Sequence, residues 1–415
     1  MGDGVAIVGA GYAGMAAAVS LAARGVRVSV FESGPVPGGR ARRVRISSDG
    51  QGHELDNGQH ILVGAYTALW DVMGKVGVPG AALLRLPLEI RYASGFSLRS
   101  LWFAAPFGLL AGVLAARGVP FSDRVGALRF MRTMRKTGFR MEPDIPVEHL
   151  LRSHGQDGRI GHYLWRPLCM AALNTPSEVA SANVFLAVLR DTLAGGGDGA
   201  DLLLPRVDLS RLFPEPAAEF LRAHGGELRC GTTVKDLSSL QAEYRNVIVA
   251  VGPHQLKVLL PELSPDFAYQ PIYTCYLQYP DTARLEFPMF GMADGLVQWV
   301  FDRGALLGEK GRLACVISAQ GDHQQMTQDE LAQICQRELR SAFPHLPTPV
   351  WTRVIAEKRA TISCTPGLQR PKVRTPITGV FLAGDYTDPE YPPTLEAAVR
   401  SGMRAADEVM SSSAG

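Results

Sequence analysis

Three closely spaced glycines near the N-terminus have the pattern that brings a peptide backbone against a dinucleotide. Gly9, Gly11 and Gly14 form the sequence Gly-x-Gly-x-x-Gly. In this pattern the first glycine allows a tight turn, the second lets the backbone approach a pyrophosphate, and the third lets a helix pack closely on a strand. The free N–H groups at the start of that helix favour phosphate oxygens. The spacing therefore predicts a nucleotide-binding turn.

The segments around these glycines are the elements that the pattern requires. Val5–Val8 is a short apolar run typical of a buried parallel strand, Met15–Arg24 is typical of a helix, and Val26–Phe31 of a second strand. Glu32 ends that strand, where its carboxylate can accept hydrogen bonds from ribose hydroxyls and disfavours a 2′-phosphate. A glycine-rich turn without a ligand is the alternative, and the complete strand–helix–strand context argues against it.

Two more segments, far apart in the sequence, extend the motif. Residues 38–40 read Gly-Gly-Arg, a flexible turn that can place an arginine on a phosphate or a flavin. Near the C-terminus, Val380–Asp385 reads as a buried strand ending in Gly-Asp, and Thr394–Met410 reads as a helix. Together with the N-terminal motif, these segments resemble the FAD-dependent amine oxidase and phytoene desaturase superfamily.

This resemblance implies a bound FAD and assigns roles to the matching residues. Gly384 and Asp385 would contact the pyrophosphate and ribitol, and Val234 would lie by the adenine. The helix that begins at Thr394 would direct its positive end at the flavin, where it stabilises negative charge on the reduced ring. The residues expected at the cofactor are Gly9, Gly11, Tyr12, Ala13, Gly14, Glu32, Ser33, Gly39, Arg40, Asn57, Gly58, Gln59, Val234, Val251, Gly252, Gly384, Asp385, Thr394 and Leu395.

The resemblance also implies an α/β fold, a Rossmann-like FAD-binding domain with an inserted α+β substrate domain. Residues 1–65, 205–265 and 366–415 would form the discontinuous FAD-binding domain, and residues 66–204 and 266–365 the substrate-facing and membrane-facing domain. Further strands are predicted at Gly226–Cys230, Thr232–Val234, Asn246–Val251, Tyr273–Tyr279, Leu296–Phe301 and Arg312–Ala319, and a helix at Gln328–Ala342.

Longer strings point to one branch of the superfamily. Residues 55–64, 163–169, 172–176, 296–303 and 384–394 are similar to hydroxysqualene dehydroxylases, the squalene-associated FAD enzymes of bacterial hopanoid pathways. The resemblance implies that a C30 isoprenoid alcohol loses its hydroxyl group and gains a hydride, which gives squalene. Such a reaction needs a general acid at the hydroxyl, aromatic faces beside an allylic cation, and a site that excludes water.

Several residues could supply these groups. His60 and Asp388 are the preferred general acids, although a structural histidine and a turn carboxylate are the respective alternatives. Asp56, which could also be a turn or cap carboxylate, and Glu390 are further candidates. The aromatic candidates are Trp299 and Tyr391, followed by Tyr386 and Trp165, and each could instead belong to the core.

Three other functions compete with this interpretation. A carotenoid (phytoene-type) desaturase would share the FAD motifs. A flavin amine oxidase often carries a lysine near the flavin, and Leu296–Arg303 contains none. A non-catalytic flavoprotein could instead serve as a scaffold for other squalene-pathway enzymes. The sequence contains one clear dinucleotide motif, so reducing equivalents would come from a nicotinamide bound without a second Rossmann unit or from a separate reductase.

Composition narrows the partners and the compartment. The 415 residues are 46% hydrophobic and 20% charged with a net charge of +2, which excludes a disordered chain and gives no global field for nucleic acid. The six cysteines form no Cys-x-x-Cys pair and no histidine arrangement indicates a metal, so no metal site is predicted. The N-terminus lacks the basic start of a signal peptide, which favours a cytoplasmic location.

One region predicts contact with lipid. Residues 100–116 carry no charge, and residues 117–140 carry seven basic side chains against one acidic one. The first stretch is short for a membrane-spanning helix, whereas an apolar wedge beside a basic helix is typical of peripheral attachment to anionic lipid. We therefore predict attachment to the inner face of the cell membrane. A buried helix with a solvated basic face is the alternative.

Overall fold

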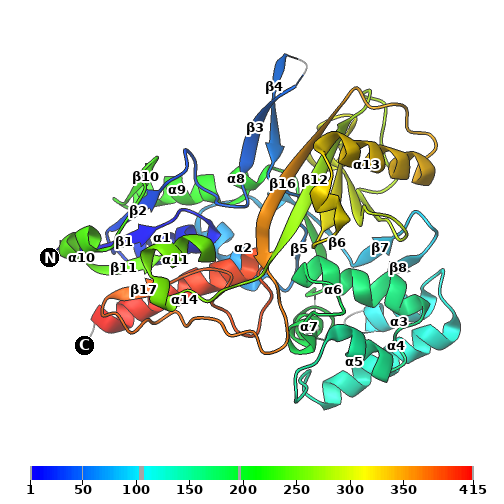
Figure 1. Ribbon diagram of the computed structural model, residues 1–415, viewed down its shortest axis with the longest axis horizontal. Helices are drawn as coiled ribbons and strands as arrows, with labels where there is room; N and C mark the ends of the chain where they lie inside the picture. Colours follow the sequence, from blue (N-terminus) through cyan, green and yellow to red (C-terminus); the bar gives the residue numbers. More distant parts are fainter. Residues whose placement is uncertain (1, 49, 102–106, 195–197, 414–415) are drawn as a thin grey trace.

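A parallel sheet carries the glycine motif. The computed structural model describes residues 2–48, 50–101, 107–194 and 198–413. Within these residues, five strands form a parallel sheet in the order β10-β2-β1-β11-β17. They are β1 (Gly2–Val8), β2 (Val28–Glu32), β10 (Glu227–Cys230), β11 (Tyr244–Val249) and β17 (Val380–Leu382). The sheet therefore joins strands from three distant parts of the chain, at one end of the molecule together with both termini (Figure 1).

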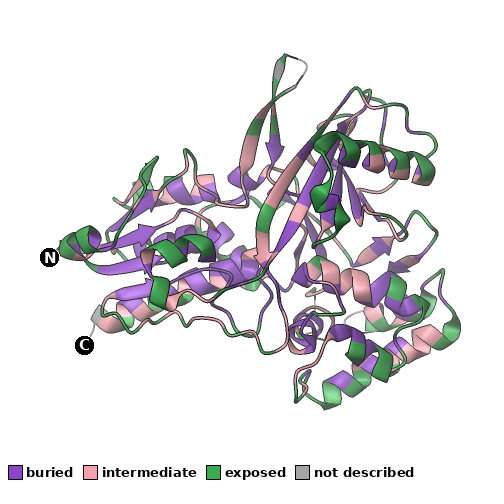
Figure 2. Ribbon diagram, in the orientation of Figure 1, coloured by how far each residue is buried: buried purple, intermediate pink, exposed green. Residues whose placement is uncertain are grey.

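Helices pack against this sheet. Every residue of α1 (Tyr12–Ala22) is buried (Figure 2), which suits a helix of small apolar residues on all its faces. The long C-terminal helix α14 (Leu395–Ser413) crosses α1 so closely that a Cβ at Gly402 would overlap the carbonyl oxygen of Ala13. The other helices of this region are α2 (Thr67–Lys75), α8 (Leu209–Leu212), α9 (Pro214–Ala223), α10 (Ser238–Glu243) and α11 (Pro253–Leu259).

A second sheet is antiparallel and lies beside the first (Figure 1). Five strands of the described residues form it in the order β13-β14-β15-β12-β16. The strands are β12 (Tyr269–Gln278), β13 (Met289–Gly291), β14 (Trp299–Asp302), β15 (Arg312–Ser318) and β16 (Trp351–Ile362). Helix α13 (Gln328–Ala342) packs on this sheet, and its boundaries match the prediction. The short helix α12 (Arg303–Leu307) connects β14 to β15.

A group of helices completes the substrate side of the molecule. It contains α3 (Phe107–Ala115), α4 (Phe121–Lys136), α5 (Val147–Ser153), α6 (Arg166–Leu173) and α7 (Ala182–Leu189). Smaller sheets pair β3 (Arg43–Ser48) with β4 (Gln51–Asp56), β7 (Glu89–Arg91) with β8 (Ser97–Arg99), and β9 (Leu202–Pro205) with both β5 (Leu62–Val63) and β6 (Leu83–Leu86). No helix among the residues that the structure describes is long and apolar enough to cross a bilayer.

The α/β fold class predicted from the sequence is confirmed, and three local predictions are corrected. Thr232–Val234 forms no strand, because the chain leaves β2 after Thr232 N–H binds the carbonyl of Glu32. Strand β14 begins only at Trp299, because the N–H groups of Leu296 and Val297 bind the Glu338 carboxylate instead of a neighbouring strand. Helix α2, which was expected in the substrate domain, packs on α1 and α14.

Candidate active site

One cavity of about 820 Å³ extends between the parallel sheet, the second sheet and helices α6 and α7. Every residue predicted to bind the cofactor lines it except Gly14, which lies inside α1. His60, Trp299 and Tyr391 line the same cavity, whereas Asp388 does not. The cavity thus has a polar half at the glycine turn and an apolar half on the substrate side.

The three glycines of the turn serve different purposes. Gly9 has φ +104°, and a Cβ there would lie 2.5 Å from the carbonyl oxygen of Ala250. A Cβ at Gly14 would overlap the carbonyl oxygen of Gly9, so this glycine is required by helix packing. At Gly11 the nearest atom to a Cβ is the Cα of Gly39, 3.9 Å away. The fold would thus accept a Cβ at Gly11, and the space in front of this residue is open to an occupant of the cavity.

Glu32 is held at the end of β2 by backbone donors. Its carboxylate accepts hydrogen bonds from the N–H groups of Ala10 and Gly34, each at 2.7 Å. These bonds join the glycine turn after β1 to the turn after β2. They hold the carboxylate at the cavity wall, where ribose hydroxyls are expected.

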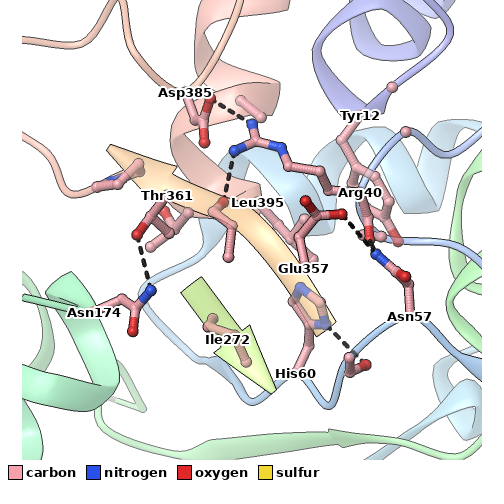
Figure 3. A pocket seen from close by; sticks show the side chains of 18 of the residues that line it. Tyr12, Arg40, Asn57, His60, Asn174, Ile272, Glu357, Thr361, Asp385 and Leu395 are labelled. Carbon is pink, nitrogen blue, oxygen red and sulfur yellow. Dashed lines mark hydrogen bonds and ion pairs between the residues drawn. The ribbon is translucent and has the colours of Figure 1, made fainter. Parts of the chain in front are cut away.

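Arg40 connects three segments that are distant in the sequence (Figure 3). Its guanidinium donates to the carboxylate of Asp385 at 2.8 Å and to the carbonyl of Ala360 at 2.6 Å. Burial opposes the charge on Arg40, but Asp385, Glu357 and Tyr269 together outweigh burial and leave the pKa of the guanidinium raised. Arg40 is therefore a fixed positive charge in the polar half of the cavity.

The loop after β4 is held by residues of the second sheet. Asn57 donates to the backbone of Arg40 at 2.9 Å and to the carboxylate of Glu357 on β16 at 3.1 Å (Figure 3). Gln59 donates to the hydroxyl of Tyr276 on β12 at 3.2 Å. Sequence reasoning missed Glu357, because nothing in the strand pattern around it indicates which carboxylate faces a cavity.

The N-terminus of α14 opens onto the cavity. Pro393, Thr394 and Leu395 line it, and the Thr394 hydroxyl caps the helix by accepting from the N–H of Ala397 at 3.2 Å. A helix of this length directs partial positive charge at its first turn. The helix is therefore oriented to stabilise an anion in the cavity.

Aromatic side chains wall the apolar half. Tyr92, Tyr163 and Trp299 line the cavity and touch one another, with Tyr92 in the middle at ring distances of 5.4 and 5.9 Å. Trp299 and Tyr391 were predicted and line the cavity, whereas Tyr92 and Tyr163 were missed. Two other aromatic candidates were wrong. Trp165 lies in the helical core with its Nε1 bonded to Gln156, and the Tyr386 ring packs beneath Gly384.

His60 lies between the polar and apolar halves, but its protonation does not suit a general acid. Its Nδ1 is 3.3 Å from the carbonyl oxygen of Gly58, which can only accept, so Nδ1 carries the hydrogen and Nε2 a lone pair. Burial lowers the pKa of His60 to about 4, and the charge on Arg40 contributes in the same direction. At neutral pH only about one molecule in a thousand would carry the extra proton. The lowered pKa thus counts against His60 as the proton donor, and that role stays a prediction.

We expect His60 to make the protein sensitive to acid. Between pH 6.5 and 4 the unfolded chain binds a proton at His60 that the folded chain does not, so the free energy of unfolding falls as the pH falls through this range. The loss from this residue should reach as much as about 3 kcal/mol. Urea unfolding at pH 7 and pH 4.5 measures it. His60→Gln should lose this component, and an equal acid sensitivity in that variant would contradict the assignment.

The acidic candidates are occupied elsewhere. Asp388 accepts from the N–H groups of Glu390 and Tyr391 at 3.1 Å and pairs with Arg404 at 2.8 Å, so it is the turn carboxylate of the alternative interpretation. Glu390 is exposed and does not line the cavity. Asp56 is buried in an ion pair with Arg303 at 3.0 Å, behind the loop of His60. None of these three residues is therefore placed to donate a proton in the cavity.

Comparison with known proteins identifies the family. The family model described as flavin containing amine oxidoreductase matches residues 12–410. A hydroxysqualene dehydroxylase from Rhodopseudomonas palustris is 29% identical, with 99% of each chain covered, and one from Zymomonas mobilis is 26% identical over 98% of this chain and 99% of its own. A probable zeta-carotene desaturase from Synechococcus elongatus is 23% identical, with 99% of each covered. The resemblance to hydroxysqualene dehydroxylases is thus confirmed.

The fold agrees with this family. The structure of wild-type putrescine oxidase bound to putrescine superposes with a TM-score of 0.67 at 17% identity, with 99% of each chain covered. The open space at Gly11, the carboxylate of Glu32, the guanidinium of Arg40 and the first turn of α14 fit a flavin dinucleotide. The chain therefore belongs to the flavin-containing amine oxidoreductase family, and its cofactor is FAD.

Proposed function

We propose that this protein is a hydroxysqualene dehydroxylase, which converts a C30 isoprenoid alcohol to squalene with loss of water. The observation that carries the proposal is the continuity of the cavity. Residues that fit FAD and residues of an apolar chamber line one space, so a hydrocarbon held in the chamber would lie beside the cofactor. The relatives described above by that name support the same substrate class.

The side chains that line the apolar half of the cavity can both bind the substrate and exclude water. Isoprene units can pack on an apolar part of the cavity wall, which is formed by Leu88, Leu168, Val188, Leu193 and Met289. The faces of Tyr92, Tyr163 and Trp299 stabilise positive charge on an allylic carbon after the hydroxyl leaves. When bound in its reduced form, the cofactor would supply the hydride that this carbon accepts and the proton with which the hydroxyl leaves as water. Because a carbocation reacts with water at once, the dry wall is as necessary as the hydride donor.

We expect hydroxysqualene to reoxidise the anaerobically reduced protein. Recovery of the oxidised flavin absorbance in single turnover, with one equivalent of squalene formed, would support the function. A desaturase would instead show bleaching of the oxidised flavin by phytoene, and an amine oxidase bleaching by an amine. A scaffold protein would show none of these changes. Failure of the reduced protein to react with hydroxysqualene would contradict the proposal.

We further propose that α3 and α4 attach the protein to the inner face of the cell membrane, where other squalene-pathway enzymes could deliver its substrate. Phe107, Leu110 and Leu114 lie on one face of α3 and are exposed, as is Phe121 at the start of α4. On α4 the buried positions are apolar, whereas Arg129 and Arg132 are exposed. Residues 102–106 of the predicted apolar stretch lie outside the described residues.

We expect charge reversal on α4 to weaken lipid binding. The double variant Arg129→Glu with Arg132→Glu should lose affinity for vesicles of phosphatidylcholine and phosphatidylglycerol by about tenfold or more, since each basic residue near an anionic surface contributes about 1 kcal/mol. Vesicle flotation measures this. The matched control reverses Arg337 and Arg340 on α13, which are also exposed, and should float like the parent protein. Equal flotation of both variants would favour α4 as a solvated helix.

A further inference from the structure

Asn174 joins the helical group to three strands of the second sheet. It follows α6 in a left-handed conformation with φ 45°. Its Oδ1 accepts from the N–H of Ala319 at 2.9 Å, and its Nδ2 donates to the hydroxyl of Thr361 at 3.0 Å (Figure 3). The same amide nitrogen lies 3.3 Å from the carbonyl oxygen of Pro271. These partners use the hydrogen-bonding groups of the Asn174 amide, so it positions its neighbours and is not itself free for a ligand.

Two hydroxyl groups in the cavity wall remain available, on the strands β15 and β16 that flank β12. Thr361 on β16 accepts the bond from Asn174, which leaves its own proton free to be donated. Ser318 on β15 immediately precedes Ala319. Both residues line the cavity, and among the residues that the structure describes no further hydrogen bond to either hydroxyl is found. A polar group in such a wall is costly to desolvate unless a ligand completes its hydrogen bonds.

Of the two hydroxyls, that of Thr361 lies next to the polar half of the cavity, and that of Ser318 lies on the other side of β12. Thr361 follows Ala360, whose carbonyl accepts from Arg40 in the polar half. Ser318 pairs across strands with Ile272 of β12, which also lines the cavity. Thr192, by contrast, lies in the wall of the apolar half and already donates to the carbonyl of Val188 at 2.7 Å. It therefore has no proton to offer a ligand.

We propose that the hydroxyls of Thr361 and Ser318 form an alcohol-recognition site, which binds the one polar atom of the isoprenoid substrate and so places the reacting carbon beside the cofactor. This inference rests on the proposed function and extends it to the groups that select the substrate. A squalene-length chain offers many equivalent positions to an apolar wall. Only the carbon–oxygen bond distinguishes one carbon from the rest, and a hydroxyl needs a partner when it leaves water. A site built around such a bond also favours the alcohol over its hydrocarbon product.

Binding to the oxidised holoenzyme tests the site, because the oxidised flavin cannot supply hydride to the alcohol. Each variant is titrated with hydroxysqualene and with squalene, and the change in flavin absorbance reports binding. The affinity ratio is the affinity for hydroxysqualene divided by the affinity for squalene. Thr361→Val keeps the shape of the side chain and removes its hydroxyl. We expect Thr361→Val and Ser318→Ala each to weaken alcohol binding about tenfold, with squalene binding unchanged. Thr192→Val is the matched control and should keep the parent ratio.

The outcomes separate this site from the proposed function. A ratio that stays at the parent value in both Thr361→Val and Ser318→Ala overturns the site, and so does a loss of the ratio in Tyr92→Phe alone, which would place recognition among the aromatic residues. A parallel loss of affinity for both ligands would show that the variants damage the chamber and would also overturn it. If the reduced parent protein does not react with hydroxysqualene, the proposed function fails whatever the ratios are.

Discussion

Gly11→Val should fold and yet contain no flavin. The nearest protein atom to a Cβ at this position is 3.9 Å away, so the branched side chain would project into the cavity without displacing the fold. It would occupy space that the dinucleotide backbone needs. Overpacking of this kind should lower the affinity for FAD by about 100-fold or more. Visible absorbance of the purified variant, compared with its far-ultraviolet circular dichroism, measures the two properties separately.

Neighbouring positions provide the controls for Gly11. Gly11→Ala should bind FAD more weakly than the parent protein but better than Gly11→Val, because one methyl group fills less of the cavity. Gly14→Val should fail to fold, since its Cβ overlaps the backbone oxygen of Gly9. A yellow, stoichiometric Gly11→Val protein would overturn the placement of the pyrophosphate at this turn.

The parts of the site that could be predicted from the sequence are those defined by local patterns. The glycine turn depends on residues within a few positions of one another, and the strand–helix–strand context around it is encoded in the same short segment. Helix α13 could be predicted for the same reason, because Thr327 and Glu330 form a capping box at its start. The small and apolar residues on every face of α1 likewise indicate a helix that is buried on all sides.

The remaining parts depend on which distant segments meet. Three carboxylates have different roles that their residue type does not reveal. Glu357 faces the cavity, Asp56 pairs with Arg303, and Asp388 caps a turn. Those roles follow from the pairing of β12 with β16 and from the position of Arg404 on α14. The protonation of His60 likewise depends on burial by segments far away in the sequence. Tertiary packing therefore decides which candidates can act.

Arg303→Met should destabilise the protein by about 3–5 kcal/mol, the range for removing one partner of a buried ion pair. Arg303 is 1% exposed and binds Asp56 at 3.0 Å and Glu309 at 2.7 Å. Without the guanidinium, the Asp56 carboxylate would stay buried with one hydrogen bond, from the N–H of Leu209. Urea unfolding measures the loss. Arg312→Met is the comparison variant, because Arg312 also pairs with Glu309 but does not pair with Asp56, and it should cost less than Arg303→Met.

Arg303→Met should also weaken FAD binding, since Asp56 leads directly into the loop of Asn57 and His60. The carbonyl of Asp56 accepts from the hydroxyl of Tyr276 at 2.7 Å, and Tyr276 in turn accepts from Gln59. Burial of an unpaired Asp56 carboxylate is costly, so the variant would more often open this loop from the second sheet to let the carboxylate reach water. Adding Asp56→Asn to Arg303→Met removes the buried charge and should restore part of both stability and FAD affinity. If Arg303→Met costs less than Arg312→Met, the ion pair does not hold the loop. The cavity would then owe its shape to the strand pairing of the two sheets alone.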